Sequence, residues 1–504
     1  MKLRPSAHLT EAQINDGLKL VIKDGLAAEA MTTLTGGAFL VALAIYMGAS
    51  NFQIGLLAAL PTFTNILQVV AIWLVQKYNN RRAIAVFCNL FARLPLLVIG
   101  LLPFLFSSGT SLPVLIFLLF FHYLFGSISG PSWNSWMKDL VPQNQLGTYF
   151  SHRSRLTQSL NVTLSLVIAM TLDFIKSHYP QQEVHAYAIM FIAGGILGMI
   201  GVYMLYRTPE PKSYLVNENI FKLFVRPLKD KNFRGLLMFQ SFWSFALNMA
   251  TPFFSVYMMK KIGLPLSYII GLGILSQISS IFSIKMWGRY SDRFSNKTII
   301  SVCAPIYIFC ILAWSFTASP GNQWLAFSLL IGIHILTGVS TAGINLAIGN
   351  MGMKLAPKEE AVVYLAARSV TVALVSAMAP IIGGLLADFF ANHQLIWNIE
   401  WQGPAGVSQI PLLHLHHWNF LFIIGAMLAL LSLRLLKKVK EEGEVERDVV
   451  VTEMRVSFKN NIKGKMGRPA IRMMFHHPLM FPAYVRKHMS RREGSIYSFR
   501  KVRA

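Results

Sequence analysis

Apolar residues gather in stretches of about 20 along most of the chain, and short polar segments separate them. A helix rises about 1.5 Å per residue, so each stretch is long enough to cross about 30 Å of hydrocarbon. Roughly twelve such stretches are present, near 25–48, 53–76, 83–106, 113–133, 155–175, 187–206, 235–258, 264–286, 298–318, 324–347, 364–390 and 418–436. The pattern predicts an all-α polytopic membrane protein.

Polar segments divide the predicted helices into two groups of six. The segment Thr208 to Arg234 carries prolines and many charges, so it is too polar to span a membrane. We expect a six-helix N-terminal half (1–207), a cytoplasmic linker (208–234), a six-helix C-terminal half (235–437) and a basic cytoplasmic tail (438–504). From Lys437 onward the chain has 17 Lys plus Arg against 7 Asp plus Glu.

The two halves share a sequence pattern at one constant spacing. Pro142 and Pro357 differ by 215 positions, and the same shift carries Tyr149 to Tyr364 and Arg153 to Arg368. It also places Lys77 against Asp292, and Gly36 and Gly37 against Thr251 and Pro252. A single offset at separated places indicates two parallel repeats of a six-helix unit, which predicts pseudo-symmetric halves.

Composition and charge support this interpretation and orient the chain. It is 54% hydrophobic and 13% charged, with a mean hydropathy of +0.49, which excludes an ordinary soluble protein. Most Lys and Arg residues fall in the loops on one side, so we expect both termini to be cytoplasmic in the cytoplasmic (inner) membrane. The cysteines, Cys88, Cys303 and Cys310, lie in apolar runs, so we expect neither a disulfide nor a metal site.

A short basic turn, MWGRYSDRFSNK, lies between two predicted helices at Met286 to Lys297. Its residues Gly288, Asp292, Arg293 and Lys297 resemble the G-x-x-x-D-R-x-G-R-K loop of the major facilitator superfamily. The resemblance covers about residues 18–437. It implies a secondary active transporter that works by alternating access, with its substrate site between the halves near the middle of the membrane.

The chain also departs from the family pattern. In the first half, Lys77 takes the position of the acid and Trp73 that of the leading glycine. We therefore expect the Asp292 loop to supply the main cytoplasmic lock, with Arg153 or Arg155 at the start of the fifth helix as its partner. The fifth helix lacks the glycine and proline pattern of many antiporters in the family, which weakens export by antiport without excluding it.

Polar side chains inside the predicted helices are candidates for substrate contact, because they are costly in lipid and tend to face a wet cavity. For any one of them, a simple hydrogen bond to a neighbouring helix is the alternative. The candidates are Thr32, Asn65, Gln68, His122, Gln240, Trp243, Asn248, His334 and Asn345.

Charged residues in the first half suggest a coupling site. Arg93 lies 11 residues past Arg82, about 16 Å deeper along the helix. An unpaired guanidinium there costs several kcal/mol, so we expect a partner, with Glu29 as first choice. A permanent structural ion pair is the alternative to proton coupling. We expect Asp24 to be interfacial, beside Lys23.

The function predicted from these features is movement of a small organic solute, coupled to protons. The alternative is a membrane receptor or lipid-handling scaffold that does not transport. We expect no enzyme activity, catalytic residue or cofactor, since no phosphate-binding loop is present. The expected partners are the solute and the bilayer, with the tail against anionic headgroups or else a disordered, solvated extension. We expect a monomer and no nucleic acid.

Overall fold

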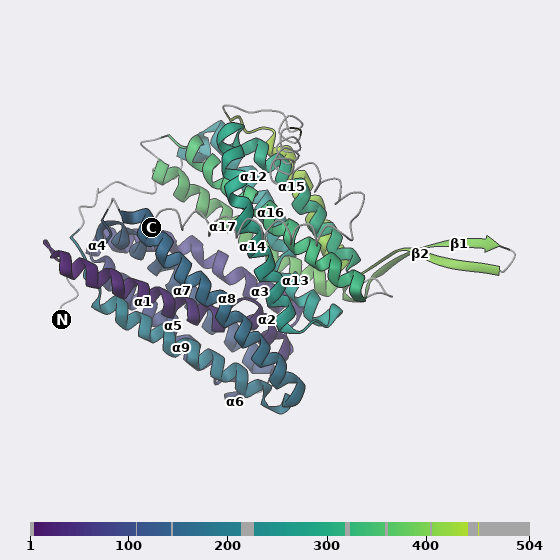
Figure 1. Cartoon of the computed structure of the whole chain (residues 1–504), viewed down its shortest axis with the longest axis horizontal. Helices are drawn as coiled ribbons and strands as arrows, with labels where there is room; N and C mark the ends of the chain where they lie inside the picture. Colours follow the sequence, from purple (N-terminus) through teal and green to yellow (C-terminus); the bar gives the residue numbers. More distant parts are fainter. Residues whose placement is uncertain are drawn as a thin grey trace, which may run out of the picture.

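The protein is described here from a computed structural model, which covers residues 5–106, 108–142, 145–212, 226–317, 323–357, 361–403, 406–441 and Thr452. Its helices form two bundles, the N-terminal half in purple and blue and the C-terminal half in teal and green (Figure 1). A β-hairpin projects from the C-terminal half, far from the N-terminus. We call this side of the molecule the hairpin end and the opposite side the termini end.

The N-terminal half has six long helical segments, several of them interrupted. The first consists of α1 and α2, and the second of α3, the short 3-10 turn η1 and α4. Their bounds, with those of the following elements, are α1 Glu11–Thr35, α2 Gly37–Tyr46, α3 Asn51–Thr64, η1 Asn65–Leu67, α4 Gln68–Tyr78, α5 Arg81–Ile99, α6 Leu102–Leu105, α7 Ser108–Leu140, α8 Leu146–His178, η3 Pro180–Gln182 and α9 Glu183–Arg207.

The C-terminal half follows the same order and adds the hairpin before its last helix. A short π-helix, η4, continues α13. The bounds are α11 Arg226–Lys229, α12 Lys231–Ala250, α13 Pro252–Tyr257, η4 Met258–Ile262, α14 Leu266–Arg293, α15 Asn296–Ala313, η5 Trp314–Phe316, α16 Gln323–Leu355, α17 Ala361–Phe389, η6 Phe390–Asn392, β1 Gln394–Gly403, β2 Gly406–His416 and α18 Trp418–Leu436.

Hydropathy predicted these helices well, and the helices extend beyond the apolar runs. In the described part of the chain, eleven are long and apolar enough to cross a membrane. The predicted span near 235–258 is present as α12 and α13, where polar residues such as Gln240 and Asn248 lower the hydropathy. Helix α1 begins at Glu11, well before the predicted residue 25, because Thr10 and Gln13 form a capping box that starts the helix outside the apolar run.

The repeat predicted from the sequence is visible in the helix bounds. Helices α7 and α16 both start and end 215 residues apart, and α8 and α17 start 215 residues apart. The interruption of the first helix at Gly36 corresponds in the same way to the boundary at Thr251 between α12 and α13. Gly37 has φ +56°, a left-handed conformation that favours glycine, so the first helix breaks where the sequence permits it. The two halves are therefore pseudo-symmetric.

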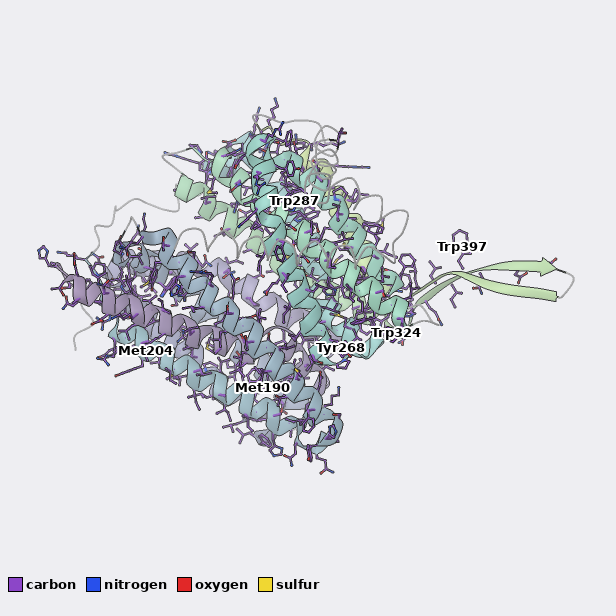
Figure 2. All side chains as sticks on the ribbon, viewed as in Figure 1. Met190, Met204, Tyr268, Trp287, Trp324 and Trp397 are labelled. Carbon is purple, nitrogen blue, oxygen red and sulfur yellow. The ribbon has the colours of Figure 1, made fainter. Side chains whose placement is uncertain are left out.

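The hairpin was not predicted. Its two strands pair antiparallel from Gln394 with His416 to Gly403 with Gly406, with an irregularity next to Trp397. Trp397 on the hairpin and Tyr268 and Trp324 on the helices lie toward the hairpin end in Figure 2, and all three side chains are exposed. Aromatic residues at such positions are typical of the boundary between lipid and water.

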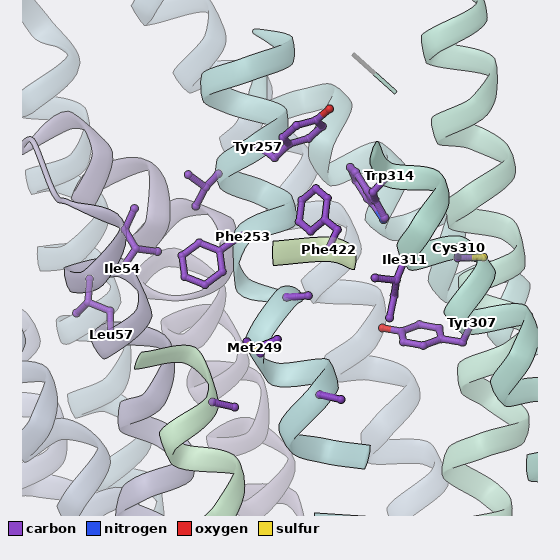
Figure 3. Close-up of a cluster of buried hydrophobic side chains, with 14 of the residues drawn as sticks. Ile54, Leu57, Met249, Phe253, Tyr257, Tyr307, Cys310, Ile311, Trp314 and Phe422 are labelled. Carbon is purple, nitrogen blue, oxygen red and sulfur yellow. The ribbon is translucent and has the colours of Figure 1, made fainter. Parts of the chain in front are cut away.

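The core at the hairpin end joins both halves. Ile54 and Leu57 of α3 face Phe253 and Met249 of the C-terminal half (Figure 3), and all four side chains are buried. Aromatic rings extend this core further into the C-terminal half, where Phe254 stacks on Trp314 with 4.5 Å between ring centroids. The two halves thus meet through apolar packing at this end of the molecule.

Candidate functional site

A cavity of about 490 Å³ lies between the two halves. Residues of α1, α2 and α8 line it from the N-terminal half, and residues of α13, α14, α15 and α16 from the C-terminal half. Its size is in the usual range for small-molecule sites. The polar and aromatic groups of its lining are Thr32, Thr33, Asn161, Ser165, Thr251, Ser255, Gln277, Thr337, Phe39, Phe254, Tyr307, Trp314 and His334.

The lining of this central cavity combines these polar and aromatic groups with apolar side chains such as Met258 and Ile333, and it carries no Lys, Arg, Asp or Glu among the described residues. His334 is held in one orientation, because its Nδ1 donates to the Leu330 carbonyl at 2.8 Å. A carbonyl can only accept, so Nδ1 carries the hydrogen and Nε2 is the acceptor. The ring meets Trp314 edge to face, with centroids 5.6 Å apart. Hydroxyls, amides and aromatic faces are therefore the available contacts for a solute.

Of the predicted substrate contacts, Thr32 and His334 line the central cavity. Asn65, Gln68 and His122 line a separate cavity of about 340 Å³ within the N-terminal half. The remaining candidates line a cavity of about 380 Å³ in the C-terminal half, which shares Thr251 with the central one. Those remaining residues are Gln240, Trp243, Asn248 and Asn345.

Several lining residues were missed by the sequence analysis. Asn161 and Gln277 are amides inside membrane-length helices, so the rule that selected the other candidates also covers them. Tyr307 and Trp314 carry no such signal, since aromatic residues are common throughout the apolar runs. Which face of a helix meets the cavity depends on packing between the halves.

In this conformation Arg93 pairs with Asp24 rather than with Glu29, its first-choice partner. Arg93 Nη2 lies 3.5 Å from Asp24 Oδ1, and Arg93 Nη1 donates to the Gly198 carbonyl at 2.5 Å. Asp24 is 3% exposed, so the expectation that it is interfacial is wrong. Gly201 makes room for the pair, because a Cβ there would lie 2.5 Å from Arg93 Nη1 and 2.8 Å from Asp24 Oδ1. Asp24 thus satisfies the guanidinium that was expected to need a partner.

Glu29 instead accepts a hydrogen bond from Asn161, which lines the central cavity. Asn161 Nδ2 donates to Glu29 Oε1 and to Thr33 Oγ1, both at 2.9 Å. Thr33 and Asn161 line the cavity, and Glu29 itself is partly buried in α1. No cation lies within ion-pair distance of Glu29 among the residues that the structure covers. The Glu29 carboxylate therefore lies one hydrogen bond away from a residue that lines the cavity.

The loop that resembles the family motif is at the termini end, and its predicted lock is not engaged in this conformation. Asp292 and Arg293 are exposed, and a Cβ at Gly288 would meet nothing within 4 Å. Arg153, one of the two predicted partners, lies over the Trp133 ring, 5.0 Å from its centroid. The other, Arg155, is exposed on α8. The lock therefore stays a prediction for another conformation.

Lys297 is part of a buried capping site that was not predicted. Its backbone N–H donates to Glu441 Oε2 at 2.7 Å, and Asn296 Nδ2 donates to Glu441 Oε1 at 2.6 Å. Glu441, in the segment assigned to the tail, is buried, with 8% of its surface exposed. It caps the start of α15, where the first backbone N–H groups have no partner within the helix.

The N-terminal half contains the matching site. Glu210 accepts from the backbone N–H groups of Arg81 and Arg82 at 2.9 and 3.1 Å, at the start of α5. Arg81 also forms ion pairs with Glu210 at 3.1 Å and with Asp139 at 2.5 Å. Lys77, in the acid position of the first loop, lies 4.8 Å from the centroid of the Trp73 ring. Carboxylates after the last helix of each half therefore hold the third helix of that half.

Comparison with solved structures supports the architecture. The nucleoside transporter NupG superposes with a TM-score of 0.60 at 12% identity, covering 85% of this chain and 100% of that one. A D-xylose–proton symporter gives 0.59 at 14% identity over 86% and 100% of the two chains. A bacterial homologue of the human lysosomal transporter Spinster, inward-facing and unoccupied, gives 0.57 at 14% identity over 86% and 100%. At these identities the likeness concerns the fold alone.

A search of curated proteins finds no match. The sequence itself matches the family model of the Major Facilitator Superfamily over residues 25–380. That range includes the central cavity, the Asp292 loop and the boundary between the two halves. The chain therefore belongs to the Major Facilitator Superfamily, and it is a secondary transporter rather than an enzyme.

Proposed function

We propose that this transporter carries a small, uncharged, polar organic solute with a ring, and that Glu29 couples its movement to protons. The observation that supports the solute class is the central cavity, whose described lining offers hydroxyls, amides and aromatic faces but no formal charge. A charged solute would need an opposite charge there, because burying an unpaired ion is costly. The similar solved structures include a nucleoside transporter and a D-xylose–proton symporter, whose named solutes fit this class.

The proposal for coupling rests on the position of Glu29. When the solute contacts Asn161 or Thr33, it competes for the hydrogen bonds that these side chains make with Glu29 and with each other. Burial favours the protonated form of a carboxyl group, whereas hydrogen bonds to the carboxylate favour the charged form. Solute binding and proton binding are thereby linked through one amide.

The proposal also covers the membrane orientation and the oligomeric state of the protein. Both termini are proposed to be cytoplasmic, with the hairpin on the other side of an inner membrane, and the excess of Lys and Arg at the termini end supports this orientation. A monomeric functional unit is proposed, because both halves that line the central cavity belong to the same polypeptide. The predicted attraction of the basic tail to anionic headgroups, about 1 kcal/mol per Lys or Arg, concerns residues outside the described part of the chain.

Reconstitution into liposomes tests both parts. Uptake of labelled neutral sugars and nucleosides is compared with that of amino acids and carboxylates, with and without a pH gradient. We expect accumulation of a neutral solute only with the gradient. Glu29→Gln abolishes accumulation but preserves exchange at equal pH, and the exposed Asp16→Asn is the matched control. Flux of charged solutes alone contradicts the solute class, and binding without any flux favours a receptor.

A further inference from the structure

The two halves are held together at the hairpin end by carboxylates that cap helices of the opposite half. Asp388, at the end of α17, accepts from the backbone N–H groups of Asn51 and Phe52 at 3.1 and 2.8 Å. These are the first two residues of α3. The Asn51 side chain adds a third bond to the same carboxylate at 2.8 Å.

The second cap has the same geometry. Asp173, near the end of α8, accepts from the backbone N–H groups of Leu266 and Ser267 at 2.9 and 2.8 Å. These are the first two residues of α14, whose N-cap Pro265 provides no side-chain cap. Asp173 lies in the N-terminal half and α14 in the C-terminal half, so this cap crosses between the halves in the reverse direction.

The two caps are related by the repeat. Asp173 and Asp388 differ by 215 positions, as do Asn51 and Leu266. The offset that relates the helices of the two halves thus also relates both partners of each cap. A chance contact would not be expected to occur twice at positions related by the same shift of 215. The cap is therefore a shared feature of both repeats.

Each cap combines two favourable effects. The first N–H groups of a helix have no partner within the helix, and a carboxylate with two oxygens satisfies two of them. The positive end of the helix dipole also favours a negative charge at this position. Separation of the halves at the hairpin end would leave two N–H groups and one carboxylate to solvent at each site.

Close backbone packing surrounds one of the caps. A Cβ on Gly55 of α3 would lie 2.1 Å from the Pro380 carbonyl oxygen of α17, and a Cβ on Gly384 would lie 2.5 Å from the Asn51 carbonyl oxygen. The helices therefore touch directly, with Asp388 at the end of the contact. This packing positions the carboxylate for its bonds and means that the cap cannot persist once α3 and α17 move apart.

We propose that Asp173 and Asp388 are paired gating residues, each of which closes the hairpin end by capping a helix of the opposite half, and that both caps break when the cavity opens there. This inference rests on the alternating-access cycle of the proposed function but not on its solute or its coupling ion. The Asp292 loop is exposed at the other end of the molecule in the same conformation. The caps thus stabilise the arrangement closed at the hairpin end.

A cysteine reporter measures the opening without any substrate. The three cysteines of the chain are replaced by Ala, and Ser255, which lines the central cavity, is changed to Cys. A membrane-impermeant maleimide is then applied from the hairpin side of oriented vesicles. Asp173→Asn and Asp388→Asn should each raise the labelling rate about fivefold and together about 25-fold, since such a cap is worth on the order of 1 kcal/mol.

A backbone variant tests the contact from the other partner. Asn51→Pro removes the N–H donor at the first helical position, where proline is well tolerated, and the preceding Ser50 is already extended at ψ 163°. It should raise labelling as Asp388→Asn does, and should add little to that variant because both break the same cap. The matched control Asp16→Asn removes the charge of an exposed acid at the termini end and should not raise labelling.

Three results would overturn the proposal. The first is an unchanged labelling rate in both Asp variants that elute as monodisperse protein. The second is an effect of Asn51→Pro that adds in full to that of Asp388→Asn. The third is equal labelling in Asp16→Asn and in the double Asp variant. A failure to transport any neutral solute would contradict the proposed function but leave these labelling results intact.

Discussion

Replacement of Asp24 by Asn should destabilise the N-terminal half strongly. Asp24 and Arg93 are 3% and 4% exposed, and the guanidinium has one ion-pair partner and one carbonyl in the described structure. Removing the carboxylate charge leaves a buried cation without compensation, which costs about 3–5 kcal/mol. For a half of about 200 residues, each kcal/mol lowers the midpoint by roughly 2–4 °C, so Tm should fall by about 6–20 °C.

The assay is thermal unfolding of the purified protein in detergent, read by intrinsic fluorescence. Asp24→Asn/Arg93→Met removes both charges with little loss of volume, so it should recover much of the lost Tm. Glu29→Gln is the matched control, because Glu29 has no cation partner among the described residues and should lose little stability. A shift below about 2 °C for Asp24→Asn, or a double variant as unstable as the sum of the single ones, would refute the ion pair as the reason.

Further predictions concern other contacts of the same structure. Gly384→Ala should raise labelling from the hairpin side, because its Cβ would lie 2.5 Å from the Asn51 carbonyl oxygen and force α3 and α17 apart. Glu441→Gln should lower the free energy of unfolding by about 1–3 kcal/mol, since it removes the charge from a buried capping site; Asp16→Asn, at an exposed acid, is its control. Burial is the main cause that lowers the pKa of His417 to about 4, and nearby cationic groups add to it while Asp388 opposes it. The ring is therefore neutral while the hairpin end is closed. Labelling, expressed relative to that of a free thiol at the same pH because the thiolate is the reacting form, should therefore rise as pH falls from about 6.5 toward 4, and His417→Gln should flatten that rise; a rise that persists in the variant would assign it elsewhere. The charged groups that face this ring are Asp388, His416, Lys260 and Lys261.

The membrane explains why the helices could be predicted so well. Every backbone N–H and C=O group in lipid needs a hydrogen-bond partner, and a helix supplies these partners within a single segment. A long apolar run therefore predicts a helix. That constraint ends at the membrane surface, and there the prediction failed. No helix or strand is predicted for the segment Ala391 to Trp418, yet it contains the β-hairpin. The backbone N–H and C=O groups of its two strands bond to each other.

The central cavity could be predicted only in part, because polarity marks a residue as costly in lipid but does not say where it points. Asn65 and Gln68 satisfy the same rule as Thr32, yet they line a different cavity. Gln68 donates to Asn65 at 3.1 Å, so these two groups partly satisfy each other within one helix segment. Only the packing of the halves selects the groups that meet a shared cavity.

The charged residues show a second limit. Depth along the helix correctly indicated that Arg93 needs a partner, but it ranked Glu29 above Asp24. The tilt and rotation of α1 against α9 decide the pairing, and Gly198 and Gly201 allow the two helices to approach closely enough for it. Glycines on a neighbouring helix are a weak signal, because apolar helices contain them for many reasons.

The caps at the hairpin end could not be predicted from single residues, for a different reason, but the repeat points to them. Their donors are backbone N–H groups, which leave no residue type in the sequence to recognise. Their acceptors are aspartates at helix ends, which are ordinary when taken singly. Under the shift of 215, however, Asp173 falls on Asp388, and this is the one pair of acidic residues that the shift relates in a chain with 22 Asp plus Glu among 504 residues. An acid that recurs in both repeats, beside a helix end, indicates a contact that both halves need, and in a transporter such contacts are the ones that must form and break together.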